Sequence, residues 1–225
     1  MEILRIDQLS KTYGSGETKV EALKEASFSV SRGEFVSIVG QSGAGKSTLL
    51  HLIGGLDTPT AGRVIIDGMD IYTLLEEELA VFRRRSIGFI FQAYNLVPEL
   101  NVEENMVLPL LLDYKKPDGR FIDELLDILG LTDRKHHLPG QLSGGQQQRV
   151  AIGRALATRP TMILADEPTG NLDSKNSREV MNLLRLSVER FNQTLLMITH
   201  NQNYATLADR VFQVEDGLVR ELGGQ

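Results

Sequence analysis

Cysteine is absent from the 225 residues of this chain. Its absence excludes disulfides, cysteine-ligated zinc, iron–sulfur clusters and a thiol nucleophile, while four histidines still permit other metal chemistry. The sequence also lacks any run of about eighteen apolar residues, and its start, MEILRIDQLSK, has acids but no apolar signal core. We therefore expect neither a membrane span nor a secretory signal. We expect a cytoplasmic chain that serves a membrane, if at all, from the inner face.

An excess of positive charge is missing too, because 30 acidic residues outnumber 24 basic ones and give a formal charge of −6. Proteins that follow nucleic-acid backbones carry basic surfaces, so this balance argues against a nucleic-acid partner. Hydrophobic residues make up 41% of the chain, close to the average of soluble globular domains. We expect one folded domain over residues 1–225.

Short apolar runs alternate with longer segments of helical spacing. Such runs are typical of buried strands, and they lie at 35–39, 87–91, 162–165, 194–199 and 211–214. Alternating patterns at 3–9 and 26–30 favour antiparallel strands, and Asp216-Gly217 favours a hairpin turn. The stretch from about 95 to 157 lacks strand patterning. The pattern predicts an α/β fold with a mainly parallel central sheet and a helical insertion at 95–157.

A glycine-rich segment, GQSGAGKS, follows the run at 35–39 and precedes a helical stretch. It fits the phosphate-loop pattern G-x-x-x-x-G-K-[ST], in which glycines let backbone amides curl around phosphate oxygens at a helix N-terminus. We expect Lys46 to reach the β- and γ-phosphates and Ser47 to hold Mg²⁺. The expected phosphate-binding residues are Gly40, Gln41, Ser42, Gly43, Ala44, Gly45, Lys46, Ser47 and Thr48. Kinases, GTPases, helicases and transport ATPases share such a loop, so other residues must choose among them.

Two further segments point to nucleotide chemistry. Asp166 and Glu167 end the run that starts at Met162, where open α/β sheets place their ligands. Asp166 can reach Mg²⁺ through water, and Glu167 can polarise the attacking water; a solvated strand cap is the alternative for the pair alone. The segment LSGGQ at 142–146 gives a serine N-cap and two glycine amides at a helix start. This segment predicts a second anion site.

The segments 40–47, 142–146 and 162–167, in this order and spacing, resemble the ATP-binding cassette ATPases over essentially the whole chain. The resemblance implies a P-loop NTPase core, an N-terminal antiparallel β subdomain and a helical insertion subdomain. It implies ATP and Mg²⁺ as cofactors, and a homodimer in the ATP-bound state whose two copies sandwich two ATP molecules head to tail. The implied activity is hydrolysis of ATP to ADP and phosphate.

The resemblance also assigns roles residue by residue. Tyr13 falls where the family places an aromatic ring against adenine, although a core tyrosine is an alternative. Asp173 matches a loop at the dimer interface, and Ser143, Gly145 and Gln146 match the contacts to the γ-phosphate held by the other subunit. The implied catalytic residues are Glu167, His200, Lys46 and Gln92, and the implied Mg²⁺ ligands are Ser47, Gln92 and Asp166.

Within the family, the segments 51–57, 87–96 and 165–173 look like the branch of lipoprotein-release, macrolide-export and antimicrobial-peptide-export ATPases. That branch implies a membrane permease partner, of the MacB- or FtsX-like or the lipoprotein-releasing type, and a peripheral position on the inner face of the membrane. It implies no nucleic acid. A nucleic-acid-associated cassette and a regulatory cassette without transport stay open as alternatives. Asn201 and Gly153 depart from residues common in relatives, Asp and Ala, and Gly153 costs its helix up to about 1 kcal/mol.

Overall fold

The computed structural model describes residues 1–223, and it divides into two compact units, each of which is described by itself. Unit 1 comprises Met1–Arg83 and the C-terminal segment from Thr194, and unit 2 comprises Arg84–Gln193. The predicted domain of residues 1–225 ends with two residues, 224 and 225, that lie outside the described residues.

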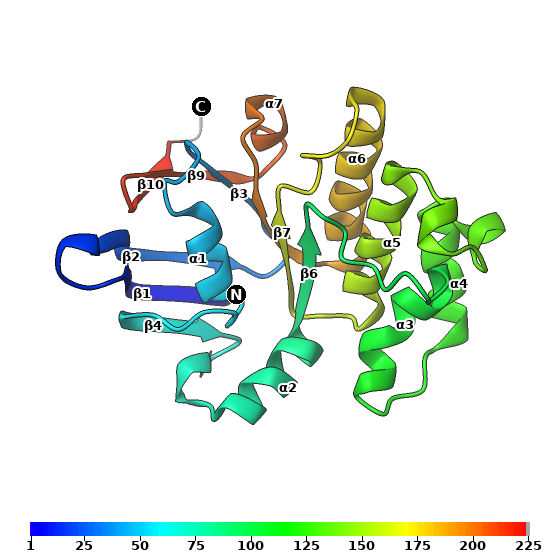
Figure 1. Ribbon diagram of the computed structural model, residues 1–225, viewed down its shortest axis with the longest axis horizontal. Coiled ribbons are helices and arrows are strands. Elements are labelled where there is room, and N and C mark those ends of the chain that lie inside the picture. Colours follow the sequence, from blue (N-terminus) through cyan, green and yellow to red (C-terminus); the bar gives the residue numbers. More distant parts are fainter. Residues whose placement is uncertain (224–225) are drawn as a thin grey trace. The chain divides into compact units, whose positions relative to one another are not determined.

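An antiparallel sheet forms one layer of unit 1. Its strands run in the order β2-β1-β4-β5, with bounds β1 Glu2–Tyr13, β2 Val20–Ser31, β4 Ala61–Ile66 and β5 Met69–Asp70. β1 pairs with β2 along one edge and with β4 along the other. The β1–β2 hairpin ends in the dark blue loop at the left of Figure 1, which contains a 3₁₀ turn at Gly16–Thr18. The predicted strands at 3–9 and 26–30 are thus present, but both are longer than their apolar patterns.

The second layer of unit 1 has the strand order β10-β9-β3-β8. Its bounds are β3 Phe35–Val39, β8 Thr194–Ile198, β9 Arg210–Glu215 and β10 Leu218–Leu222. β3 is parallel to both β8 and β9, and all five of its residues are buried. β9 and β10 form the predicted hairpin, with positive φ at Asp216 and Gly217. Helix α1 (Lys46–Ile53) follows β3, and the one-turn α7 (Gln202–Ala205) follows β8.

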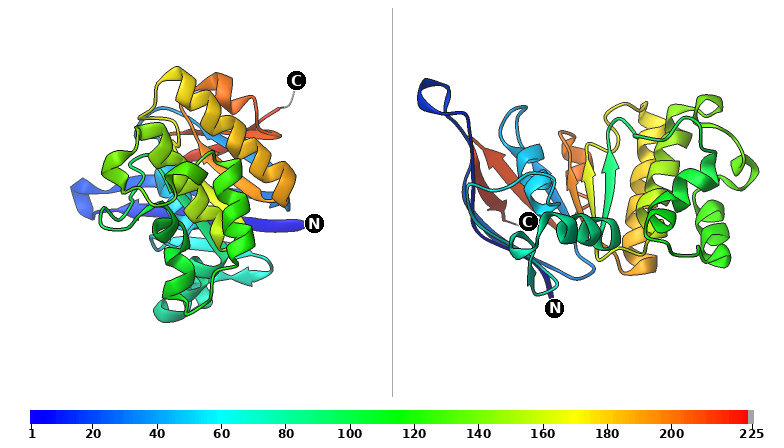
Figure 2. Two further views of the ribbon diagram at one scale, coloured as in Figure 1. Left: turned by 90° about the vertical axis from the view of Figure 1, so that its right-hand side faces the viewer. Right: turned by 60° about the horizontal axis from the view of Figure 1, so that its bottom comes forward.

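Unit 2 contains two parallel strands and four helices of eight or more residues after α2 (Glu76–Ser86), which spans the boundary between the units. The strands are β6 Ile87–Phe91 and β7 Met162–Asp166. The helices are α3 Val102–Leu112, α4 Gly119–Ile128, α5 Gly144–Ala157 and α6 Ser174–Phe191. Helix α5 packs against α3, α4 and α6, as both views in Figure 2 show. The predicted helical insertion at 95–157 therefore holds α3, α4 and α5.

A buried carboxylate connects the end of α2 to the end of α3. Arg84 and Arg85, from the end of α2, both donate to the carboxylate of Asp113, the C-cap of α3, whose side chain is 3% exposed. A hydrogen bond from Lys115, followed by those from Arg84 and Arg85, holds the pKa of Asp113 well below its usual range. None of the helices within residues 1–223 is long and apolar enough to cross a bilayer.

Candidate functional site

The last residue of the loop between β3 and α1 has a backbone conformation that only glycine adopts without strain. Gly45 has a φ of 107°, and a β carbon placed on it would lie 2.2 Å from the carbonyl oxygen of Ala22 on β2. Gly45 is also the N-cap of α1. A glycine has no side chain with which to cap a helix, so the start of α1 presents its amides and its positive dipole end to a ligand.

Lys46, the first residue of α1, is buried although it carries a charge. It is 7% exposed, and its Nζ donates to the carbonyl oxygens of Gly40 at 2.9 Å and Gln41 at 2.8 Å. The ammonium group is therefore fixed against the loop by the loop's own backbone. A buried cation needs such partners, and here two carbonyl oxygens of the loop supply them.

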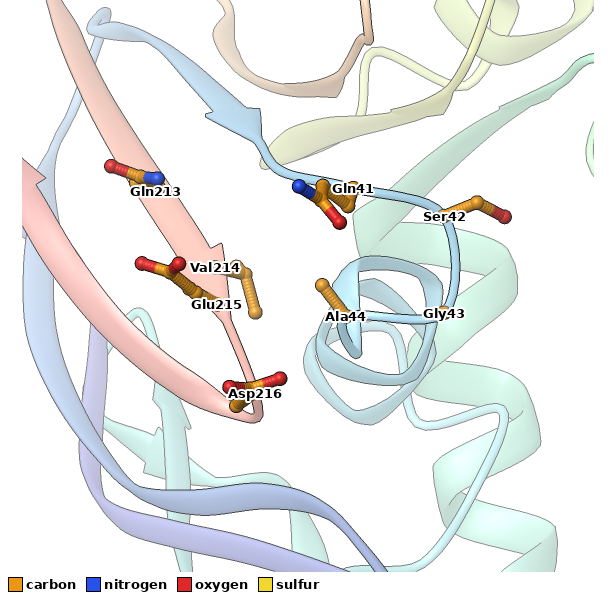
Figure 3. A pocket seen from close by; sticks show the side chains of 8 residues that line it. All are labelled: Gln41, Ser42, Gly43, Ala44, Gln213, Val214, Glu215 and Asp216. Atoms are coloured by element: carbon orange, nitrogen blue, oxygen red, sulfur yellow. The ribbon is translucent and has the colours of Figure 1, made fainter.

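A pocket of about 320 Å³ lies between this loop and β9 (Figure 3). Its walls are Gln41, Ser42, Gly43 and Ala44 on one side and Gln213, Val214, Glu215 and Asp216 on the other. The carboxylates of Glu215 and Asp216 lie on the β9 side of the pocket. The β9 wall of the pocket is therefore acidic.

Tyr13 is the last residue of β1, and its ring is 42% exposed. Its hydroxyl donates to Oδ2 of Asp57 at 2.6 Å. Partial burial raises the pKa of Tyr13, and the hydrogen bond to Asp57 raises it further. An exposed aromatic ring with an anchored hydroxyl is not a core tyrosine, so the alternative reading of this residue as core does not fit.

His200 follows β8 in the same unit and is exposed. The next residue, Asn201, caps α7 through its Oδ1, which accepts a hydrogen bond from the amide of Asn203 at 3.0 Å. Asn and Asp are equally good N-caps. The departure from the Asp of many relatives therefore leaves the start of α7 intact.

In unit 2, β7 carries Asp166 as its last residue, after four fully buried positions. Glu167 follows with a φ of 46°, in the left-handed region that non-glycine residues seldom adopt. Holding a residue there costs about 1–3 kcal/mol, and such residues cluster at functional sites. The extended conformation of β7 therefore ends at Asp166, and Glu167 starts the turn that follows the strand.

Gln92 follows β6 and forms a reciprocal pair with Asn171. Its Nε2 donates to Oδ1 of Asn171 at 3.1 Å, and Nδ2 of Asn171 donates to the Gln92 carbonyl at 2.9 Å. The pair fixes the orientation of the Gln92 amide, with its nitrogen towards Asn171 and its Oε1 available as a metal or water ligand. Asn171 was not among the predicted site residues, because nothing in its local pattern marks it.

The predicted serine N-cap of α5 is present. Ser143 Oγ accepts from the amide of Gln146 at 3.3 Å, and Oε1 of Gln146 accepts from the amide of Ser143 at 2.9 Å, which is a capping box. Gly145 is buried against α6, where a β carbon on it would lie 2.3 Å from Oδ1 of Asn176. The glycine lets the two helices approach.

Asp173 caps α6 and also binds Asn176. Its Oδ1 accepts from the amides of Lys175 at 3.0 Å and Asn176 at 2.8 Å, and its Oδ2 accepts from Nδ2 of Asn176 at 2.8 Å. These hydrogen bonds, chiefly those from Asn176, lower the pKa of Asp173. Asn176 therefore connects two predicted site residues, Gly145 and Asp173, within unit 2.

The structure thus brings the predicted residues together in two groups. Unit 1 holds Tyr13, the loop from Gly40 to Thr48, and His200, while unit 2 holds Gln92, the segment from Ser143 to Gln146, Asp166, Glu167 and Asp173. Sequence reasoning missed the residues that support them. Lys11, Asp57 and Asn171 bind residues far away in the sequence, and Asn176 lies against Gly145 on another helix, so no local pattern could have revealed those contacts.

Comparisons with known proteins agree with this geometry. The family model described as ABC transporter matches residues 23–170. A lipoprotein-releasing system ATP-binding protein, LolD, of Geobacter metallireducens is 48% identical over 96% of this chain and 97% of its own length. The macrolide export ATP-binding/permease protein MacB of Brucella melitensis is 46% identical over 96% of this chain, which spans 34% of that longer protein.

A solved structure gives the same result. A dimeric ATP-binding cassette in a post-hydrolysis state, bound to ADP and Pi, is 43% identical and superposes with a TM-score of 0.87 over 99% of this chain and all of that one. The predicted fold class, with its parallel strands, antiparallel subdomain and helical insertion, is confirmed by this likeness. The chain belongs to the ABC transporter family of ATP-binding cassette ATPases.

Proposed function

We propose that this chain is the ATP-binding and ATP-hydrolysing subunit of an export or mechanotransmission complex of the LolD/MacB type. The observation that carries the proposal is the loop at residues 40–47. Gly45 takes a backbone conformation reserved for glycine, and the buried Lys46 is held by the loop carbonyls of Gly40 and Gln41. This arrangement suits a polyphosphate, and the family supplies ATP as the nucleotide.

In this proposal each unit contributes chemistry to hydrolysis. Lys46 stabilises the negative charge on the β- and γ-phosphates, and Tyr13 stacks on adenine. Glu167 orients and polarises the attacking water, while His200 and Gln92 contact the γ-phosphate and that water. Phosphoryl transfer depends mainly on such positioning and charge stabilisation, so these residues can supply most of the catalysis.

The donor chemistry of three predicted residues also suits a magnesium ion. Ser47, Gln92 and Asp166 offer a hydroxyl, an amide oxygen and a carboxylate, and hard oxygen ligands are those that Mg²⁺ prefers. The orientation of the Gln92 amide, with its nitrogen on Asn171, leaves Oε1 for this role. When bound, the ion would neutralise charge on the phosphate oxygens.

We further propose that residues 1–225 act as one nucleotide-binding domain, with a helical subdomain at roughly 95–157, and that two copies close around ATP. Ser143, Gly145 and Gln146 of one copy would bind the γ-phosphate held by Lys46 of the other, and Asp173 would lie at the interface. The related cassette bound to ADP and Pi is a dimer, which supports this arrangement.

The partner in this proposal is a membrane permease, of the MacB- or FtsX-like or the lipoprotein-releasing type, with this chain bound at the inner face of the membrane. The support comes from relatives named LolD and MacB at 46–48% identity. MacB joins its cassette to a permease in one polypeptide, as its name states.

A hydrolysis assay tests the enzymatic part. The purified chain should release phosphate from ATP in the presence of Mg²⁺, and Glu167→Gln should lower the rate at least about 100-fold. Glu77→Gln on the exposed first turn of α2 is the control and should match the wild type. Equal rates for both variants would contradict the role of Glu167.

Co-purification tests the partner. Tagged Glu167→Gln chain is isolated from gently solubilised membranes in ATP and Mg²⁺, and the bound proteins are identified by mass spectrometry. A permease with a large extracytoplasmic domain is the expected result. Ribosomal or DNA-repair proteins without a permease would overturn the proposed export role and favour a nucleic-acid-associated cassette.

A further inference from the structure

One carboxylate in unit 1 holds two side chains that the sequence does not connect. Asp57, in the loop after α1, accepts from Nζ of Lys11 through Oδ1 and from the hydroxyl of Tyr13 through Oδ2, both at 2.6 Å. Lys11 and Tyr13 lie on β1, more than forty residues earlier in the chain. The pairing of β1 with β4, which follows Asp57, brings them together.

Asp57 is itself firmly held. Its Oδ1 accepts from the amide of Thr58 at 2.7 Å, and the Tyr72 hydroxyl lies 2.6 Å from the carbonyl oxygens of both Leu52 and Asp57. Burial opposes ionisation of Asp57, but the hydrogen bonds from Lys11 and Tyr13 outweigh it and lower its pKa. The carboxylate is therefore charged at neutral pH.

These contacts fix the ring of Tyr13 at both ends. Its Cα belongs to β1, and its hydroxyl is bound to Asp57 and to the side chain of Thr48 on α1. Nζ of Lys11 lies 4.7 Å from the ring centroid, over one face, where a cation–π attraction holds it. Tyr13 as a whole is still 42% exposed, so part of the residue is accessible to a ligand.

We propose that Asp57 is a positioning residue for nucleotide binding: it anchors the Tyr13 hydroxyl and the Lys11 ammonium, and so presents one face of the tyrosine ring to the base. The inference rests on the proposed stacking of Tyr13 on adenine. A ring already ordered before the ligand arrives loses little conformational freedom on binding. Asp57 connects this ring to the loop that ends α1, the helix that starts at the phosphate loop.

The test separates the base from the phosphates. Binding of ADP and of inorganic pyrophosphate, each with Mg²⁺, is measured by calorimetry on the full chain. Asp57→Asn should weaken ADP binding about 3- to 10-fold, the range expected for freeing one ordered side chain, and leave pyrophosphate binding unchanged. Asp67→Asn is the matched control, because Asp67 is an aspartate of the same unit that pairs with Arg32, and it should bind both ligands as the wild type does.

Tyr13 variants separate this inference from the proposed function. Tyr13→Ala should lose the advantage of ADP over pyrophosphate; if it keeps that advantage, the proposed adenine contact is wrong and the inference falls with it. If Tyr13→Ala loses the advantage but Asp57→Asn keeps it, the adenine contact stands and the positioning role is overturned. Equal weakening of ADP and pyrophosphate by Asp57→Asn would likewise overturn it, because Asp57 would then support only the phosphate loop.

A double mutant checks the mechanism. In a Tyr13→Phe background the hydroxyl anchor is already gone, so Asp57→Asn should add much less to the loss of ADP affinity than it does alone. Fully additive losses would contradict the anchoring of Tyr13 by Asp57. Because Tyr13 is partly exposed, Tyr13→Phe should fold. This variant therefore tests the hydroxyl anchor even if an Asp57 variant is unstable.

Discussion

The two predicted anion sites both lie at a helix start, but they are built differently. The start of α1 has Gly45 as its N-cap, in a left-handed conformation and with no side chain to offer. The start of α5 is closed by a reciprocal box between Ser143 and Gln146. One site is shaped by backbone conformation and the other by side chains, so equivalent substitutions should affect them differently.

The largest effect should come from the charge at α1. Lys46→Ala removes the buried ammonium from the loop and leaves the carbonyls of Gly40 and Gln41 without their donor. We expect ATP hydrolysis to fall at least about 100-fold, as when one donor to a developing charge is deleted. A phosphate-release assay checks it, with Lys19→Ala as the control, because Lys19 is exposed and pairs with nearby Glu21. Activity near wild type would show that the loop amides support ATP hydrolysis without the Lys46 ammonium.

The next prediction compares the glycines of the two sites. Gly45→Ala places a β carbon 2.2 Å from a backbone oxygen at a φ of 107°, whereas Gly145→Ala meets side-chain atoms of Asn176 and requires no positive φ. Urea unfolding should show a loss of about 2–4 kcal/mol for Gly45→Ala and about 1–2 kcal/mol for Gly145→Ala. The reverse order would contradict the distinction between a backbone-built and a side-chain-built site.

Two substitutions of Ser143 distinguish its role as the helix cap of α5 from its proposed role in ligand binding. Ser143→Ala should lower the free energy of unfolding by about 1 kcal/mol, because the cap is lost. Ser143→Asp keeps a good cap and should be close to wild type in stability, yet its charge should repel the γ-phosphate and prevent ATP-dependent dimerisation. Unfolding and light scattering measure the two effects; dimerisation of Ser143→Asp in ATP would exclude Ser143 from the phosphate contact.

The smallest effect is expected within the body of α5. A β carbon on Gly153 would lie 2.7 Å from Cε of Met106 and 2.9 Å from Cδ1 of Leu129, all in buried surroundings. Ala gains about 1 kcal/mol of helix propensity, and overpacking costs about 1–3 kcal/mol, so Gly153→Ala should be neutral to slightly destabilising. Gly119→Ala, at the start of α4 with open space around it, is the control and should stabilise. Clear stabilisation by Gly153→Ala would show that α3 and α5 can shift enough to accommodate the added methyl group.

Much of the fold follows from local sequence patterns. The strands Phe35–Val39 and Ile87–Phe91 have the predicted bounds, because both are short apolar runs bordered by glycine or polar residues. β4 was not predicted, since Ala61, Gly62 and Arg63 are exposed and give no alternation. Propensity cannot reveal a strand that is held by pairing with a neighbour.

The site likewise combines local features, which the sequence predicts, with long-range contacts, which it does not. The phosphate loop and the serine cap are local, so their spacing alone predicts them. The residues that orient them act across the chain: Asp57 anchors Tyr13, and Asn171 pairs with Gln92, over separations of 44 and 79 residues. The left-handed backbone at Glu167 was also unpredicted, because Glu has no intrinsic preference for that conformation.

In the proposed dimer a complete site needs two copies, with the loop at 40–47 from one and Ser143 from the other. The most direct test is the mass in solution, by light scattering, of Glu167→Gln with millimolar ATP and Mg²⁺. We expect an ATP-dependent dimer that disappears when Ser143→Asp is added. A Glu167→Gln chain that stays monomeric in ATP, while still binding the nucleotide, would contradict it.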